Sequence, residues 1–158
     1  MAWGQTMARY KHYDYGQMKL VPVSFDQQIL PGTFEHTLSE LIDQEFDLTV
    51  FEAQYHNNET GAPAYDPAIL LKIILFAYSK GVTSSREIEQ LCRDNVVFMA
   101  LSADSSPHFT TIANFISRQQ DEIVSIFRDV LLVCDEQGLI GKQMFAVDGV
   151  KLPRRGKA

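Results

Sequence analysis

The sequence contains few cysteines and no arrangement of them that suggests a cross-link or a metal site. Its two cysteines, Cys92 and Cys134, form no CxxC pair and have no neighbouring histidine pair. The spacing therefore predicts neither a disulfide framework nor a zinc site. We interpret both residues as small buried hydrophobic side chains of a protein in the reducing cytoplasm.

Long hydrophobic runs are also missing. The most apolar stretch, residues 68–78, is interrupted by Lys72 and is far shorter than the roughly 20 residues that span a bilayer. The start of the chain lacks the charged and apolar regions of a signal peptide. The sequence therefore predicts a cytoplasmic protein with no membrane partner.

Positive charge is scarce, since 14 lysines and arginines stand against 20 aspartates and glutamates, for a net charge of −6. Four of the basic residues lie in residues 151–158, which contain no acid, so residues 1–150 hold 10 basic and 20 acidic residues, a net charge of −10. This balance argues against non-specific wrapping of nucleic acid, which needs many Lys and Arg side chains. It leaves room for one local basic face.

Apolar residues at helical spacing predict a mostly α-helical bundle. Thr33 is placed to cap a helix whose apolar stripe reaches Ile42, and Asp47 is placed to cap a shorter helix that reaches Tyr55. Residues 1–31 contain helix-breaking prolines and are predicted to form an extended arm. The polar stretch at residues 56–63 is predicted to be a loop.

A helix-turn-helix outline follows. Asp66 and Pro67 suit the N-cap and first position of a helix that ends at Gly81. Helical spacing predicts its buried face as Ile69, Leu70, Ile73, Ile74, Ala77 and Tyr78. Ser84 has capping-box spacing with Glu87 and begins a second helix. The outline fits a DNA-binding helix-turn-helix and equally two helices that pack in a core.

Three further helices are predicted. The first is capped by Asn95 and runs to Leu101, the second begins at Thr110 or Thr111, and the third occupies residues 120–137. The second helix is predicted to turn Ile112, Phe115 and Ile116 inward and Asn114, Arg118 and Gln119 outward.

Seven polar residues suit contact with DNA, because they combine donors for phosphate with an amide that can pair with adenine. They are Arg86, Arg93, His108, Thr110, Thr111, Asn114 and Arg118. The alternative is that they are solvated side chains on ordinary capped surface helices.

The end of the sequence has a different character. Residues 144–152 place β-branched and apolar side chains around Asp148 and Gly149 and predict one C-terminal β-strand. An Asp-Gly pair between apolar residues is typical of a hairpin turn. The alternative is a strand that ends in a carboxylate facing a metal ion.

Five segments occur together in a characteristic order. They are Phe34–Leu38, Tyr65–Gly81, Ser85–Glu89, His108–Ile116 and Phe145–Leu152. In these segments the sequence resembles the N-terminal part of bacterial insertion-sequence transposases of the aspartate-aspartate-glutamate (DDE) class. Several motifs in one order make this resemblance more specific than a single helix-turn-helix pattern.

The resemblance implies a helical domain followed by a ribonuclease-H-like catalytic domain, whose first strand carries the first catalytic aspartate. Asp148 corresponds to that residue and would be a ligand of Mg²⁺ or Mn²⁺ in the complete enzyme. Three carboxylates would hold two metal ions about 4 Å apart, one to activate the attacking oxygen and one to stabilise the leaving oxygen. The implied partners are the terminal inverted repeats of the element's DNA and either a second copy or a full-length transposase.

Only ten residues follow Asp148, and they contain no counterpart of the second Asp or of the Glu. We therefore expect an extended arm at residues 1–31, a helical transposase domain at 32–141, and at 142–158 the first strand of a truncated ribonuclease-H-like domain with a basic tail. The isolated chain is expected to be catalytically inactive and to bind no cofactor.

The expected function is that of the N-terminal part of an insertion-sequence transposase, which binds element ends and pairs transposase copies in DNA transposition. Two alternatives stay open. The chain could be a stand-alone DNA-binding or dimerising module that inhibits full-length transposase, or a decayed fragment without a function.

Overall fold

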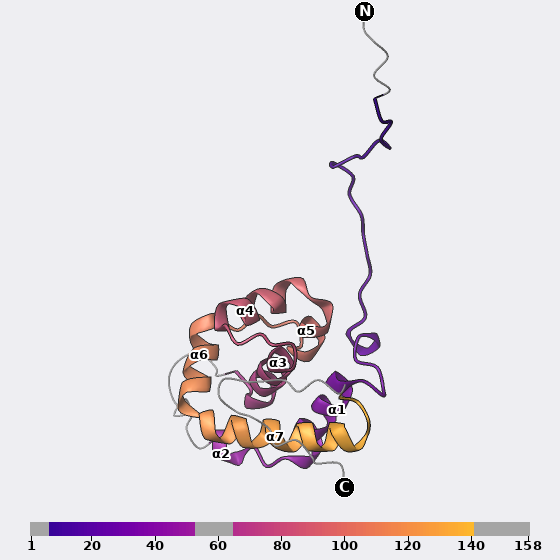
Figure 1. Ribbon diagram of the computed structural model, residues 1–158. Helices are drawn as coiled ribbons and strands as arrows, with labels where there is room; N and C mark the ends of the chain where they lie inside the picture. Colours follow the sequence, from indigo (N-terminus) through magenta and orange to yellow (C-terminus); the bar gives the residue numbers. More distant parts are fainter. Residues whose placement is uncertain (1–6, 53–64, 141–158) are drawn as a thin grey trace, which may run out of the picture.

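The computed structural model describes residues 7–52 and 65–140, and in these ranges the chain is mostly α-helical and contains no β-strand (Figure 1). The predicted helical fold class is thereby confirmed. Tyr55, the loop at 56–63 and the predicted strand with Asp148 lie outside the described residues. The elements are the 3₁₀-helix η1 (Phe25–Gln27), α1 (Phe34–Glu40), the π-helix η2 (Leu41–Glu45), α2 (Thr49–Glu52), α3 (Pro67–Ser79), α4 (Ser85–Asp94), α5 (Val96–Leu101), α6 (Phe109–Arg118) and α7 (Gln120–Glu136).

Helix α3 lies at the centre of the fold and contacts α1, η2, α4, α5 and α6 (Figure 1). The prediction of one buried face is wrong, because Leu71, Leu75 and Phe76 are buried as well, while Ile69 is only half-buried. A helix that is hydrophobic on all sides needs neighbours on all sides. This requirement explains why the other helices surround α3.

Lys72 is the charged residue of α3, and an ion pair accounts for its position. Its Nζ atom lies 2.8 Å from each carboxylate oxygen of Asp43 on η2. The Lys72 side chain is 13% exposed, so its aliphatic part packs along the core while its ammonium group reaches the edge. The pair also fixes η2 against α3.

Side-chain caps begin α3, α4 and α5 where the sequence predicts them. Asp66 Oδ1 accepts from Ala68 N at 2.9 Å at the start of α3, and Ser84 Oγ accepts from Glu87 N at 3.4 Å at the start of α4. Asn95 Oδ1 accepts from the first amides of α5, at 2.9 Å from Val97 N and 3.4 Å from Phe98 N. Helices α3 and α4 are joined by residues 80–84 and contact each other, an arrangement that fits both interpretations of the helix-turn-helix outline.

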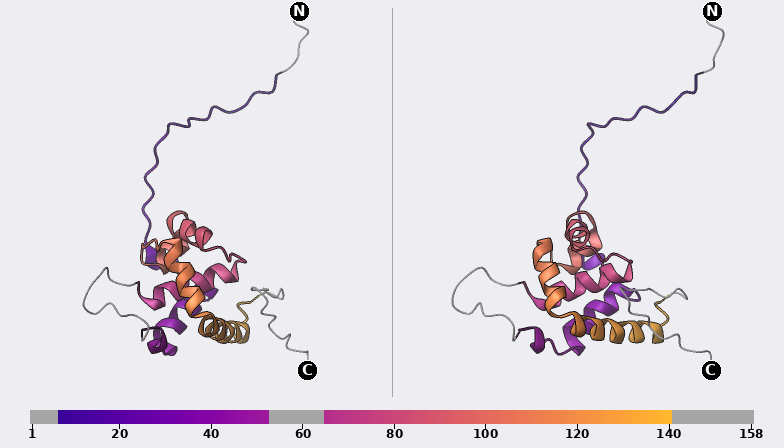
Figure 2. Two further views of the ribbon diagram at one scale, coloured as in Figure 1. Left: turned by 90° about the vertical axis from the view of Figure 1, so that its left-hand side faces the viewer. Right: turned by 60° about the vertical axis from the view of Figure 1, so that its left-hand side comes forward.

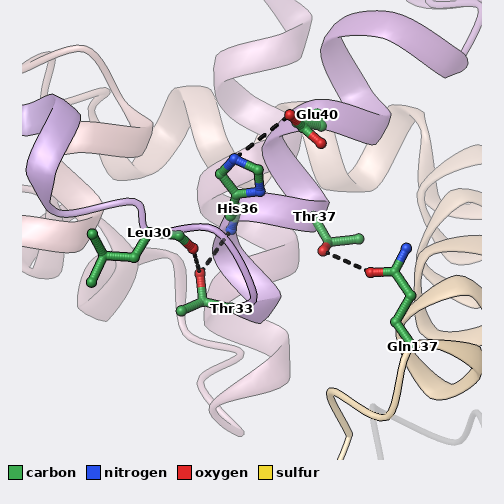
Figure 3. Close-up of polar contacts among 6 residues, drawn as sticks. All are labelled: Leu30, Thr33, His36, Thr37, Glu40 and Gln137. Carbon is green, nitrogen blue, oxygen red and sulfur yellow. Dashed lines mark hydrogen bonds and ion pairs between the residues drawn. The ribbon is translucent and has the colours of Figure 1, made fainter.

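Helix α7 packs against α1 and α6. Helical spacing predicts six inward residues on this helix, and the structure half-buries Ile126 and buries the other five: Ile123, Phe127, Val130, Leu131 and Cys134. At its C-terminal end, Gln137 Oε1 accepts a hydrogen bond from Thr37 Oγ1 of α1 at 3.2 Å (Figure 3). The chain then turns at Gly138, whose φ of 71° is in the left-handed region that glycine adopts without strain.

Residues 7–24 extend away from the helices, and the views in Figures 1 and 2 agree on this. We call these residues the projecting segment. Its base is fixed, because η1 contacts α5, Ile29 packs against the core and Thr33 Oγ1 donates to Leu30 O at 2.6 Å (Figure 3). Within residues 7–52 and 65–140, no helix combines the length and hydrophobicity needed to cross a bilayer.

Replacing the α5 cap tests how much these local bonds stabilise the fold. Asn95→Ala removes the acceptor for two first-turn amides, so we expect the free energy of unfolding to fall by about 1 kcal/mol. Urea denaturation followed by circular dichroism measures this change. Asn95→Asp keeps the acceptor and serves as the control, and equal stability of the two variants would contradict the prediction.

Candidate nucleic-acid interface

Helices α4 and α6 pack against each other and carry six of the seven residues predicted to contact DNA, with His108 just before α6. All seven are exposed except Thr111, which is half-buried. The structure places most of them in two groups, one at the N-terminus of α6 and one along α6. Arg93 belongs to neither group.

The first group is built around the start of α6. The His108 ring caps the helix, because its Nδ1 atom accepts from Thr110 N at 3.3 Å and lies 2.8 Å from Thr110 Oγ1. The helix therefore begins at Phe109, and the prediction that Thr110 or Thr111 begins it is wrong. With Nδ1 accepting, a neutral ring carries its proton on Nε2, which is the donor left for a ligand.

Phe109 joins α4 to this group. The Arg86 guanidinium carbon lies 3.8 Å from the centroid of the Phe109 ring, and the His108 and Phe109 ring centroids are 4.3 Å apart. A cation over an aromatic face is attracted by the ring quadrupole, so Phe109 holds the Arg86 guanidinium beside the N-terminus of α6. The sequence pattern did not identify Phe109 as part of the site, because this residue precedes the expected start of the helix and no feature of the pattern sets it apart.

The second group lines a shallow hollow of about 190 Å³ beside α6. Thr111, Asn114 and Arg118 follow one another at intervals of three and four residues, so they lie along one side of the helix. They share the hollow with Phe115 and with Phe51 of α2 and Leu70 of α3. Hydroxyl, amide and guanidinium groups therefore lie side by side above an apolar floor.

Gln119 also lines this hollow, but its environment differs from the predicted one. The sequence places it on the outside of the helix, whereas the side chain is only 3% exposed. Its position between α6 and α7 turns it toward the core. Among the described residues, Oε1 of Gln119 has no hydrogen-bond partner.

Arg93 is the weakest of the candidates. Its Nη2 atom lies 3.6 Å from Oε1 of Glu89 on the same helix, so part of its charge is offset. Arg86 and Arg93 are two turns of α4 apart, about 10 Å along the helix axis.

Helices α6 and α7 differ in their charge. Helix α6 contains no acid and ends in Arg118. Helix α7 carries five acids with Arg128 as its basic residue, namely Asp121, Glu122, Asp129, Asp135 and Glu136. An anionic ligand is therefore repelled by α7 and tolerated by α6.

The predicted metal ligand, Asp148, lies outside the described residues. Within residues 7–52 and 65–140, no group of three or more His, Cys, Asp or Glu side chains is arranged to hold a metal ion. The prediction of Mg²⁺ or Mn²⁺ at Asp148 therefore stays a prediction.

Both cysteines are buried and free, as the sequence predicts. Burial raises the pKa of the Cys92 thiol to about 11 and that of the Cys134 thiol to about 11. The thiols are therefore protonated at neutral pH and poor nucleophiles, in keeping with a structural role.

Comparison with known proteins identifies one relationship. The sequence model of the family described as Transposase domain (DUF772) matches residues 23–118, which extend from just before η1 to the end of α6. No curated protein and no solved structure matches the chain. Both groups of the candidate interface lie inside the matched residues.

Gln119→Met tests the unpartnered acceptor. The substitution removes a buried oxygen that has no hydrogen-bond partner among residues 7–52 and 65–140 and keeps a side chain of similar length, so we expect the free energy of unfolding to rise by about 1 kcal/mol or more. Chemical denaturation measures this change. Gln137→Met is a matched control that removes a bonded oxygen, and we expect it to lower stability slightly. A loss of stability in Gln119→Met would show that Oε1 has a partner.

The cysteines predict a pH dependence. Because folding raises both thiol pKa values from 9.0 to about 11, the stability that their neutral form contributes is present below about pH 9 and lost as the pH rises toward 11. We expect the wild-type chain to lose more free energy of unfolding between about pH 8 and about pH 10.5 than a Cys92→Ala, Cys134→Ala double variant. Equal losses would contradict the prediction.

Proposed function

The chain belongs to the transposase domain (DUF772) family, and from this membership we propose that its helical domain binds the terminal inverted repeats of an insertion sequence during DNA transposition. The observation that carries the proposal is the acid-free polar side of α6 with the Arg86 guanidinium stacked at its N-terminus. Among the described helices, α6 is the one that combines an exposed arginine with the absence of any acid.

In the proposed complex α6 reads bases. An α-helix is about 10–12 Å in diameter with its side chains, which fits the major groove of about 12 Å width, and the residues from Thr110 to Arg118 extend about 12 Å along its axis. Asn114 offers both a donor and an acceptor, the pair that an adenine edge requires. Arg118 can donate to guanine or to phosphate, and the Thr111 hydroxyl to phosphate.

Helix α4 would contact the phosphate backbone. Arg86 is exposed and held by Phe109, so little side-chain entropy is lost when it meets a phosphate. His108 adds the Nε2 donor beside it. Arg93 contributes less, because Glu89 competes for its charge. In this arrangement the helix that reads bases is α6, and α3 and α4 pack together in the domain while α4 presents Arg86 to phosphate.

For the chemistry of transposition, we propose Asp148 as a ligand of Mg²⁺ or Mn²⁺ in the complete transposase. A metal ion held there would activate or stabilise a reacting oxygen, and two further carboxylates would have to complete the site. Transposition joins two element ends, so we also propose that two copies of the domain pair.

Binding is tested by fluorescence anisotropy with a duplex of the inverted repeat and a scrambled duplex. With three arginines as phosphate contacts, we expect a salt slope near −2.7 and a loss of roughly 40-fold in affinity between about 50 and about 200 mM salt. Arg118→Glu should weaken binding to both duplexes and lower the slope by about 1. Asn114→Ala should cost about 1–3 kcal/mol and remove discrimination between the duplexes.

Arg128→Glu is the matched control, because it makes the same charge change on the acidic helix α7. It should bind both duplexes nearly as the wild-type chain does. If Arg128→Glu and Arg118→Glu weaken binding equally, the contact is not located on α6. If the wild-type chain binds neither duplex at low salt, the proposed function is wrong.

A further inference from the structure

The projecting segment exposes an unusual amount of apolar surface. Eight of the thirteen large hydrophobic residues that are exposed in the described ranges lie in it: Met7, Tyr10, Tyr13, Tyr15, Met18, Leu20, Val21 and Val23. Tyr15, Leu20 and Met18 are 98%, 97% and 95% exposed. Monomeric proteins rarely expose contiguous apolar surface of this extent without an interaction to cover it.

The sign of its charge differs from that of the helices. The projecting segment carries Arg9, Lys11 and Lys19 against Asp14, whereas the described residues after it, 25–52 and 65–140, carry six lysines and arginines against seventeen acids. The net positive charge of the segment is therefore complementary to the net negative charge of the helical domain.

The segment points away from the helices of its own chain. Its base is fixed by the contact of η1 with α5 and by Ile29 in the core, and from there it leaves the helices in all views (Figures 1 and 2). Eighteen extended residues reach up to roughly 60 Å, which is enough to cross the surface of a second domain.

We propose that the projecting segment docks on the acidic helical domain of a second copy of this chain, and that two copies exchange these segments reciprocally. The inference rests on the pairing of copies in the proposed function and names the surface that achieves it. A stable interface takes about 20–30 residues from each partner, and in a two-fold dimer each copy supplies eighteen segment residues and a receiving surface.

Nucleic acid is the other partner that a basic segment could meet, and the observations favour protein. DNA contact would use the three cations, yet Met18, Leu20, Val21 and Val23 form a run of apolar side chains that phosphates do not attract. Apolar contacts reward burial against another apolar surface. The helical domain supplies carboxylates for the cations, and its exposed large apolar side chains are those of Leu30, Val50, Tyr65, Val96 and Leu132.

The test is sedimentation of the full chain over a concentration series, with three sets of substitutions. One variant carries Met18→Ser, Leu20→Ser and Val21→Ser, and a second carries Arg9→Glu, Lys11→Glu and Lys19→Glu. The matched control carries Ala8→Ser and Gln17→Ser, two substitutions in the segment that remove neither a charge nor a large apolar side chain. None of the substituted residues belongs to the core, so the circular dichroism spectrum of each variant should match that of the wild-type chain.

We expect a wild-type dimer whose dissociation constant rises at least tenfold in both segment variants and stays unchanged in the control. Added salt should weaken the wild-type dimer and have little effect on the variant with reversed charges. A wild-type chain that stays monomeric, or segment variants that dimerise like the wild-type chain, would overturn the inference.

DNA binding by the same proteins separates this inference from the proposed function. Arg118→Glu should lose affinity for the inverted repeat and remain dimeric. If the segment variants lose DNA affinity without any change in oligomeric state, the segment is a DNA contact and the inference is wrong, while the role of α6 stands. If the dimer forms through the segment but no variant binds DNA, the proposed DNA binding fails and the docking stands.

Discussion

The burial of α3 on every side is the constraint on which the rest of the structure depends. An isolated helix of this composition would expose apolar side chains all round, and burial of each large one contributes about 1.5–3 kcal/mol. One neighbouring helix can cover only one side, so α1, η2, α4, α5 and α6 all contact α3. The single charge within α3, at Lys72, is accommodated because Asp43 lies at the edge to receive it.

This arrangement determines which side chains of the candidate interface face solvent. Helices α4 and α6 use Ile88 and Ile112 to contact the core, so the polar residues on their opposite sides face outward. Helix α6 contains no acid, whereas α7 carries carboxylates outside its buried face. The same packing that stabilises the domain therefore exposes on α6 the polar residues that the proposed function uses to contact DNA.

Local features of the fold could be predicted from the sequence, and features that depend on contacts between helices could not. Asp66, Ser84 and Asn95 form caps with amides two or three residues away, so sequence spacing is sufficient to find them. The stacking of Arg86 on Phe109 joins two helices, and no spacing rule encodes it.

The errors in the predicted site have a related cause. His108 acts as a cap through a ring nitrogen, although histidine is not among the favoured N-cap residues. Gln119 lies at the turn between α6 and α7, where the direction of the side chain depends on how the two helices cross and not on helical periodicity. The burial of α3 on every side could have been recognised from its sequence, because its apolar residues occupy positions all around the helix.

The acidity of the helical domain connects the proposed interface with the projecting segment. Three arginines give one domain only modest attraction to phosphate, and the surrounding carboxylates oppose any extension of that contact. Two linked domains raise the effective concentration of the second binding event once the first has formed. A dimer held by the segments would therefore bind DNA through two α6 faces and reach a higher affinity than one acidic domain can. It would also bind two element ends together.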